Sequence, residues 1–136
     1  MKQFKYDEIG YWSEIKLHII REYASAYSKI LAAQSAIKCH IYIDAFAGAG
    51  KHVSKRTGEF VAGSPLNALL VRPPFSEIHL VDLHGGKAEE LRILVGARKD
   101  VLFTSKMPTR CCWIKYSHGA VTKASAAGFA FSIRTP

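Results

Sequence analysis

Acidic residues are missing from the last quarter of this chain. None of the 11 Asp and Glu residues lies beyond Asp100, whereas five of the 19 Lys and Arg residues do, so much of the net charge of +8 belongs to residues 101–136. Before that segment, Lys51, Lys55 and Arg56 form a small basic loop. A clustered basic surface is the usual sign of nucleic-acid binding. Because the excess charge is concentrated in the tail, the sequence gives contact with nucleic acid only weak support.

Cysteines are few and long apolar runs are absent. Cys39, Cys111 and Cys112 form no C-x-x-C pair, and neither they nor the six His residues show a metal-ligand spacing. No apolar stretch approaches the roughly 18 residues of a membrane span, and the start does not resemble a signal peptide. The sequence therefore predicts no metal site and no membrane segment, and the odd cysteine count favours a reduced cytoplasm.

A glycine-bearing turn follows a short apolar run. Residues 42–50 read YIDAFAGAG, in which the strand-like run ends at Asp44 and the turn carries Gly48 and Gly50. Glycines let a backbone approach a ligand closely, and an acid at a strand end can accept hydrogen bonds from the ligand or from loop amides. The pattern favours a cofactor site, with Phe46 and Ala47 shaping the turn. The structural alternative is an ordinary turn after a buried strand.

A second apolar run also ends in an acid. Residues 77–83 read EIHLVDL, followed by Gly85-Gly86 and a helical pattern. In dinucleotide-binding folds the acid at the tip of the second strand accepts hydrogen bonds from a ribose. Asp82 fits that role, and Leu83 beside it is a further predicted cofactor contact. The alternative is that Asp82 caps the following helix.

The loop does not match two common nucleotide motifs. A nicotinamide-binding loop needs a third glycine where Val53 stands and a ribose acid about 20 residues further on, whereas Asp82 lies 32 residues after Gly50. A Walker loop would need glycine at Ala45 and a hydroxyl at His52. Both motifs position a phosphate chain, so a ligand without a pyrophosphate fits this turn better.

These motifs resemble those of a known family. DAFAGAG at 44–50 is similar to motif I of S-adenosylmethionine-dependent methyltransferases, and IHLVD at 78–82 resembles the second-strand acid of that fold. Together with Tyr11-Trp12, Lys16 and a long helix, and with Gly63-Ser64-Pro65-Leu66, they resemble the start of three-Cys-motif partner proteins. The resemblance covers residues from about 10 to 100.

The resemblance implies S-adenosylmethionine as cofactor and a partner protein with a three-cysteine motif encoded nearby. It implies no particular reaction, and no residue of this chain is identified as catalytic. Two alternatives stay open, a nucleotide-dependent oxidoreductase and a noncatalytic interaction module that uses the aromatic residues of the first helix.

The expected fold is α/β. Trp12, Ile15, Ile19, Tyr23, Tyr27 and Ile30 recur at helical spacing and predict an amphipathic helix over about 12–35, packed on the sheet that carries Ile41 and Ile43. A polar loop at 51–63, a short helix capped by Ser64 and a surface helix around 87–94 complete the pattern. Residues 1–100 thus predict the N-terminal half of a Rossmann-like methyltransferase fold, a parallel sheet with flanking helices.

Residues 101–136 follow neither the strand nor the helix period. They are too rich in aromatic residues for an ordinary solvated tail. We interpret them as disordered or as translated out of frame, so that the 136-residue product is truncated and inactive. An incomplete sheet is expected to leave the strand at Ile41–Asp44, or its neighbour, with an unpaired edge.

Overall fold

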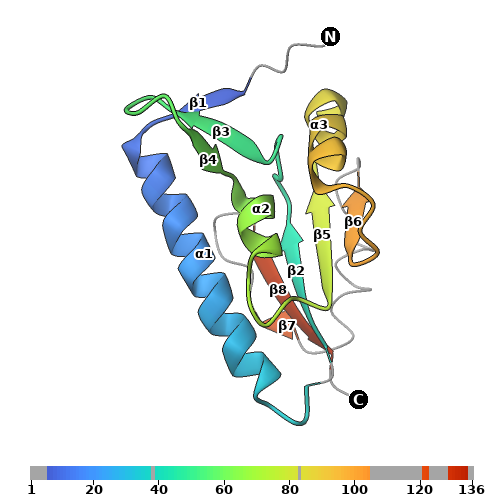
Figure 1. Cartoon of the computed structure of the whole chain (residues 1–136). Coiled ribbons are helices and arrows are strands. Elements are labelled where there is room, and N and C mark those ends of the chain that lie inside the picture. Colours follow the sequence, from blue (N-terminus) through green and yellow to red (C-terminus); the bar gives the residue numbers. More distant parts are fainter. Residues whose placement is uncertain (1–5, 38, 83, 105–120, 123–128, 135–136) are drawn as a thin grey trace.

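The computed structural model describes residues 6–37, 39–82, 84–104, 121–122 and 129–134 (Figure 1). In chain order they form β1 (Asp7–Ile9), α1 (Tyr11–Ala32), β2 (Cys39–Asp44), β3 (Lys51–Ser54), β4 (Phe60–Ala62), α2 (Ser64–Leu69), β5 (Glu77–Val81), α3 (Gly85–Val95), β6 (Val101–Thr104), β7 (Val121–Thr122) and β8 (Phe129–Arg134). This mixture of helices and strands confirms the predicted α/β class. None of the helices in these ranges is long and apolar enough to cross a membrane.

The larger sheet has five strands in the order β6-β5-β2-β8-β7 (Figure 1). The strands β2, β5 and β6 are parallel, while β8 is antiparallel to β2 and β7 to β8. The predicted parallel pairing of the two acid-ending strands is therefore confirmed. The expected unpaired edge is wrong for both, because β2 lies between β5 and β8, and β5 lies between β2 and β6.

One face of this sheet carries the core. Tyr42 on β2 lies opposite Ile78 on β5, so both side chains project from the same face. Ala24 of α1, Ala68 of α2 and Leu91 of α3 belong to the same buried cluster. All three helices therefore bury apolar surface against this face, and each fully buried large side chain contributes about 1.5–3 kcal/mol.

Helix α1 confirms the predicted long helix but buries a partly different face. Four members of the predicted stripe, Trp12, Ile19, Tyr23 and Ile30, are 59–76% exposed. The buried positions are Ala24, Ser28 and Leu31. The small residues Ala24 and Ser28 let the helix approach the larger sheet closely. They contact the face of the sheet from which Tyr42 projects, not the opposite face, from which Ile41 projects. Of the predicted stripe, Ile15 and Tyr27 are half-buried and Tyr27 packs against the core cluster, so the large apolar residues indicated a face that is only partly the buried one.

The segment predicted as a polar loop at 51–63 forms two strands instead. β3 and β4 pair antiparallel, and β1 joins β3 in parallel to complete a three-stranded sheet. The hairpin closes where Ser54 Oγ accepts the amides of Arg56 and Thr57, and where Gly58, with φ of +71°, donates its amide to the Ser54 carbonyl. Side-chain bonds of this kind are typical of polar turns, so the turn chemistry was visible while the short flanking strands were not.

The other two helices lie close to their predicted places. The surface helix predicted around 87–94 is present as α3, in which Leu91 is buried and Leu94 is half-buried. In α2 the cap is Gly63 rather than Ser64, and the Ser64 side chain makes no capping bond. The prediction of Ser64 as the cap is therefore wrong, and its hydroxyl has another partner.

Beyond Asp100 the chain adds strands that the sequence pattern did not predict. β6 pairs in parallel with β5 over four residues, and β8 pairs with β2 over six. The rest of the tail, residues 105–120, 123–128 and 135–136, lies outside the described residues. The interpretation of the tail as disordered or out of frame stays a prediction.

Candidate functional site

The two acids end neighbouring parallel strands. Asp44 is the last residue of β2 and pairs in register with Leu80, two residues before Asp82. The Asp82 amide continues the ladder by donating to the Thr104 carbonyl of β6 at 3.2 Å. Because the carboxyl ends of parallel strands meet at one edge, both carboxylates lie where ligands bind in open α/β sheets.

The turn after β2 is fixed by three successive amides. Phe46 N–H donates to Asp44 Oδ1 at 3.1 Å, Ala47 N–H to the Val81 carbonyl at 3.1 Å, and Gly48 N–H to Asp82 Oδ2 at 2.7 Å. The first bond is an Asx-type turn, in which an aspartate bonds the backbone two residues on. The loop is therefore tied to the ends of both strands, and the two sequence motifs form one structural unit.

Asp82 also contacts the start of α3. Its Oδ1 accepts the amide of His84, the residue before the first turn of that helix, at 2.7 Å. The structural alternative for this acid thus has a counterpart, because Asp82 bonds the backbone at the helix start, and Asp82 also holds the glycine loop through Gly48. The ribose role stays a prediction. An ionised carboxylate offers about four acceptor positions, so two such bonds leave capacity for a further donor on this half-buried group.

Asp44 is fully buried, at 0% exposed. Its Oδ2 accepts the Ser64 hydroxyl at 2.5 Å, and its Oδ1 accepts the Phe46 amide. The pKa of Asp44 is raised to about 6, mainly by burial and also by the nearby charge of Asp82, while the bonds from Ser64 and Phe46 oppose this rise. This acid therefore orders the loop from within the protein.

Ser64 is the residue of this site whose role sequence analysis missed. Its hydroxyl bonds Asp44 instead of the helix backbone, which joins the first turn of α2 to the end of β2. The neighbouring Gly63 donates its amide to the Gly50 carbonyl at 2.8 Å, and a Cβ at Gly63 would lie 2.9 Å from that carbonyl oxygen. The signal was present in the Gly63-Ser64 pair, but the sequence did not reveal its partner.

The two loop glycines have different surroundings. Gly48 and Gly50 have φ of +63° and +80°, in the left-handed region that glycine adopts without strain. A Cβ at Gly50 would lie 2.5 Å from Leu91 Cδ1, whereas no described residue other than its chain neighbours places an atom within 4 Å of a Cβ at Gly48. Gly50 therefore permits close packing against α3, and Gly48 presents backbone to open space.

The remaining predicted contacts are not all at the surface. Phe46 is 66% exposed and Ala47 is 3% exposed, within the core cluster. Leu83 lies outside the described residues. The structure thus brings together Asp44, Gly48 and Asp82, places Phe46 on the outer side of the turn, and gives Ala47 a packing role.

The cavity beside Asp82 is small. It is lined by Ala47, Leu80, Leu91, Phe103 and Thr104 as well as Asp82, and its volume is about 10 Å³. That is the space of about one water molecule. A nucleoside at this edge would therefore lie on the outer surface of the loop, over the open side of Gly48.

The described residues contain no group of side chains suited to a metal ion. Within the described ranges, no three His, Cys, Asp or Glu side chains gather so as to hold a metal ion. No family model, curated protein or solved structure matches this chain.

Proposed function

We propose that this chain binds S-adenosylmethionine at the carboxyl edge of β2 and β5, as a methyltransferase-like protein of the three-Cys-motif partner group. One observation carries the proposal. The Gly48 amide donates to Asp82 Oδ2 at 2.7 Å, so the glycine loop and the second-strand acid meet. A cofactor with an adenosyl and an amino-acid moiety needs a backbone that it can approach closely, and it also needs a hydrogen-bond acceptor for its ribose.

The strand order supports this proposal. Counted from β2, the neighbours β5 and β6 follow in parallel, as the first three strands do in a doubly wound sheet. On its other side β2 meets an antiparallel strand, β8, where such a fold has a parallel one. The proposal therefore rests on the half of the sheet that carries the two acids.

Each residue of the site has a different role in this proposal. Gly48 offers open backbone, and Asp82 has acceptor capacity left for ribose hydroxyls. Asp44, whose oxygens bond Ser64 and Phe46 inside the protein, orders the turn. No described residue of this edge is assigned to methyl transfer, so the proposal for this chain is cofactor binding, with a three-cysteine-motif protein as partner in the cytoplasm.

Calorimetric titration with S-adenosylmethionine tests the proposal. Asp82→Ala should weaken binding by about 1.5–3 kcal/mol, the range for hydrogen bonds to a charged group, and Asp82→Asn should lose less. Asp100→Asn is the matched control, because Asp100 stands just before β6 at the opposite end of the sheet and bonds Arg98. Circular dichroism would establish that each variant is folded.

The result can also reject the proposal. If the folded wild-type chain shows no saturable heat with S-adenosylmethionine, or if Asp82→Ala and Asp100→Asn lose affinity equally, the glycine turn is a structural turn only. A parallel titration with NAD⁺ distinguishes the oxidoreductase alternative, for which the missing third glycine already counts against binding.

The exposed apolar side chains of α1 favour a second candidate function, that of an interaction module. The outward stripe of α1, formed by Trp12, Ile19, Tyr23 and Ile30, leaves four large apolar side chains more than half exposed on one helix. Contiguous exposed apolar surface is typical of protein interaction sites. A noncatalytic interaction module would keep this stripe and bind no adenosyl ligand, so the same titration separates the two functions.

A further inference from the structure

A second cavity lies between α1 and the end of α2, away from the proposed cofactor edge. Its volume is about 210 Å³, and it is lined by Arg21, Ser25 and Lys29 of α1 and by Asn67 and Arg72 from the other side. We call it the α1–α2 cleft. Ser64, at the first turn of α2, reaches Asp44, whereas Arg72 lies beyond the last turn. The cleft and the cofactor edge are therefore at opposite ends of this helix.

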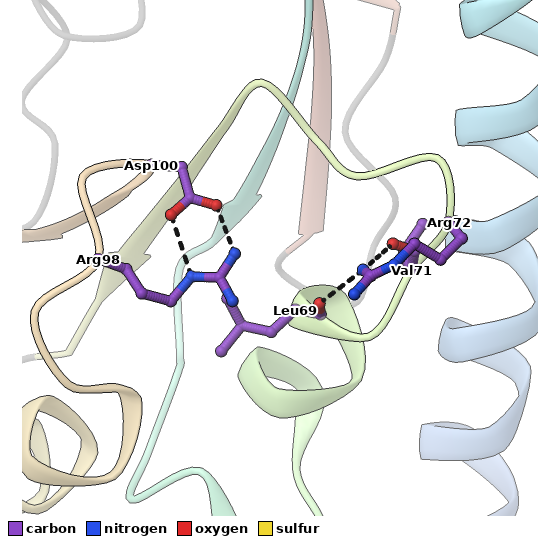
Figure 2. Close-up of polar contacts among 5 residues, drawn as sticks. All are labelled: Leu69, Val71, Arg72, Arg98 and Asp100. Carbon is purple, nitrogen blue, oxygen red and sulfur yellow. Dashed lines mark hydrogen bonds and ion pairs between the residues drawn. The ribbon is translucent and has the colours of Figure 1, made fainter.

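Arg72 is held in place by the backbone. Its Nη1 donates to the Val71 carbonyl at 2.8 Å and to the Leu69 carbonyl at 3.3 Å, so the guanidinium folds back over the end of α2 (Figure 2). Because a guanidinium has five N–H donors, three remain after these two bonds. The charged group is thus oriented before any ligand arrives.

The α1 side of the cleft supplies two more cations. Arg21, Ser25 and Lys29 are spaced four residues apart and so follow one side of the helix. Within the residues that the structure describes, neither the Arg21 guanidinium nor the Lys29 ammonium has a hydrogen bond or an ion pair. No described residue therefore competes with a ligand for either group.

The cleft has an excess of positive charge. Among the described residues that line it, Glu22 is the one acid, and Glu22 faces His18 at 3.9 Å on the exposed side of α1. Three cations thus face one acid, and bringing them together without a counter-charge is unfavourable. An anion in the cleft would remove this repulsion and would receive charge-assisted hydrogen bonds from two elements.

We propose that the α1–α2 cleft binds a phosphate group, either as the free ion or as the end group of a phosphate monoester. Arginine forks match the oxygens of phosphate, and lysine adds a mobile point charge. The volume of about 210 Å³ is below the roughly 300–1,000 Å³ of pockets that enclose whole small molecules. The cleft therefore holds the phosphoryl group, either free or at the end of a larger ligand whose remainder extends into solvent.

Titration at fixed ionic strength tests this assignment. Inorganic phosphate and glycerol 3-phosphate are the two phosphate probes. Glycerol is the control for the part of glycerol 3-phosphate that carries no phosphate. Malonate is the control for a dianion of another shape. The chain should bind one or both phosphate probes at a single saturable site. Tighter binding of glycerol 3-phosphate identifies an esterified phosphate as the ligand, and tighter binding of inorganic phosphate identifies the free ion.

Three variants distinguish phosphate binding in the cleft from a general effect of the protein's net charge. Lys29→Gln and Arg72→Gln should each weaken phosphate binding about tenfold or more, a factor that corresponds to about 1.4 kcal/mol. Arg98→Gln removes the same charge from a guanidinium that bonds both oxygens of Asp100 (Figure 2), and it should leave the affinity unchanged. Lys29 makes no side-chain bond to a described residue, so its variant tests the cleft without disturbing the end of α2.

Three outcomes would overturn the proposal. They are the absence of saturable phosphate binding, equal losses in Lys29→Gln and Arg98→Gln, and an affinity for malonate equal to that for phosphate. The last would mean that the cleft selects charge alone.

Discussion

His40 donates a hydrogen bond to Ser28, and this assigns the tautomer of a buried imidazole. Ser28 Oγ lies 2.8 Å from His40 Nε2 and 2.5 Å from the Pro73 carbonyl oxygen. A carbonyl only accepts, so the single hydroxyl proton of Ser28 goes to Pro73, and the proton between Ser28 and His40 belongs to the imidazole. The pair joins α1 to the start of β2 and to the segment after α2.

Removing this hydroxyl should destabilise the fold. Ser28→Ala removes a fully buried hydroxyl and leaves the N–H of the buried His40 side chain, and the carbonyl of the exposed Pro73, without their partner. The cost of unpaired buried groups is about 1–3 kcal/mol, to be measured as a lower free energy of unfolding in urea. Ser25→Ala, one turn earlier on the same helix, is the control and should change stability little. Equal stability of both variants would contradict the bond assignment.

His40 should make the protein sensitive to acid. Burial lowers the pKa of His40 below its ordinary value of 6.5, so the unfolded chain takes up this proton more readily than the folded chain. The stability linked to His40 is therefore present above pH 6.5 and is lost as the pH falls through the folded pKa. His40→Gln should show a smaller loss over that range in urea unfolding. Parallel curves for the two proteins would rule out this linkage.

Asp44 should act in the opposite direction. Its folded pKa of about 6 lies above the ordinary value of 3.8, so its stabilising effect is fully present below pH 3.8 and is lost as the pH rises through about 6. Relative to Asp44→Asn, the wild-type chain should lose up to about 3 kcal/mol across that window, at 1.36 kcal/mol for each unit of pKa. Urea unfolding of both proteins at several pH values measures the difference, and a constant difference would contradict a raised pKa.

The two loop glycines should tolerate alanine differently. Both have positive φ, so each substitution strains the backbone by about 1–2 kcal/mol. Only Gly50→Ala also places its Cβ against Leu91, a buried side chain with little room to move, and overpacking of this kind costs about 1–3 kcal/mol more. Thermal unfolding should rank Gly50→Ala below Gly48→Ala, and the reverse order would argue against the packing described for α3.

The reassigned face of α1 can be tested in the same way. Leu31→Ala should lower the free energy of unfolding by about 2–5 kcal/mol, as core truncations do. Ile30→Ala, one position earlier but on the exposed stripe, should change it by less than about 0.5 kcal/mol. If both variants lose the same stability, the stripe is covered in solution.

The sequence predicted those parts of the fold whose signals are local. The strand ending at Asp44, the helix around Leu91 and the α1 helix all follow from short-range periodicity. The buried face of α1 does not follow from this periodicity. Ala24 and Ser28 are small residues, and they are buried because the helix approaches the sheet closely and because Ser28 forms hydrogen bonds there.

In the candidate site, too, local sequence signals predicted some residues and missed a contact between distant segments. Asp44, Gly48 and Asp82 were predicted from their places at strand ends, and these are the residues that the structure brings together. The link between Ser64 and Asp44 spans 20 residues and depends on how α2 sits against β2. Periodicity within one segment carries no information on such a contact, and the same holds for the pairing of β8 with β2.

That pairing has a consequence for the order in which the chain folds. β2 meets β5 across about 36 residues, between Asp44 and Leu80, but it meets β8 across about 85, between Asp44 and Phe129. Closing the longer loop costs about 0.8 kcal/mol more, since the entropy of closure grows with the logarithm of loop length. Contacts between distant segments also form more slowly. We therefore expect β2 to gain its neighbours in two kinetic stages, with the parallel side, which carries both acids, ordered before the antiparallel side.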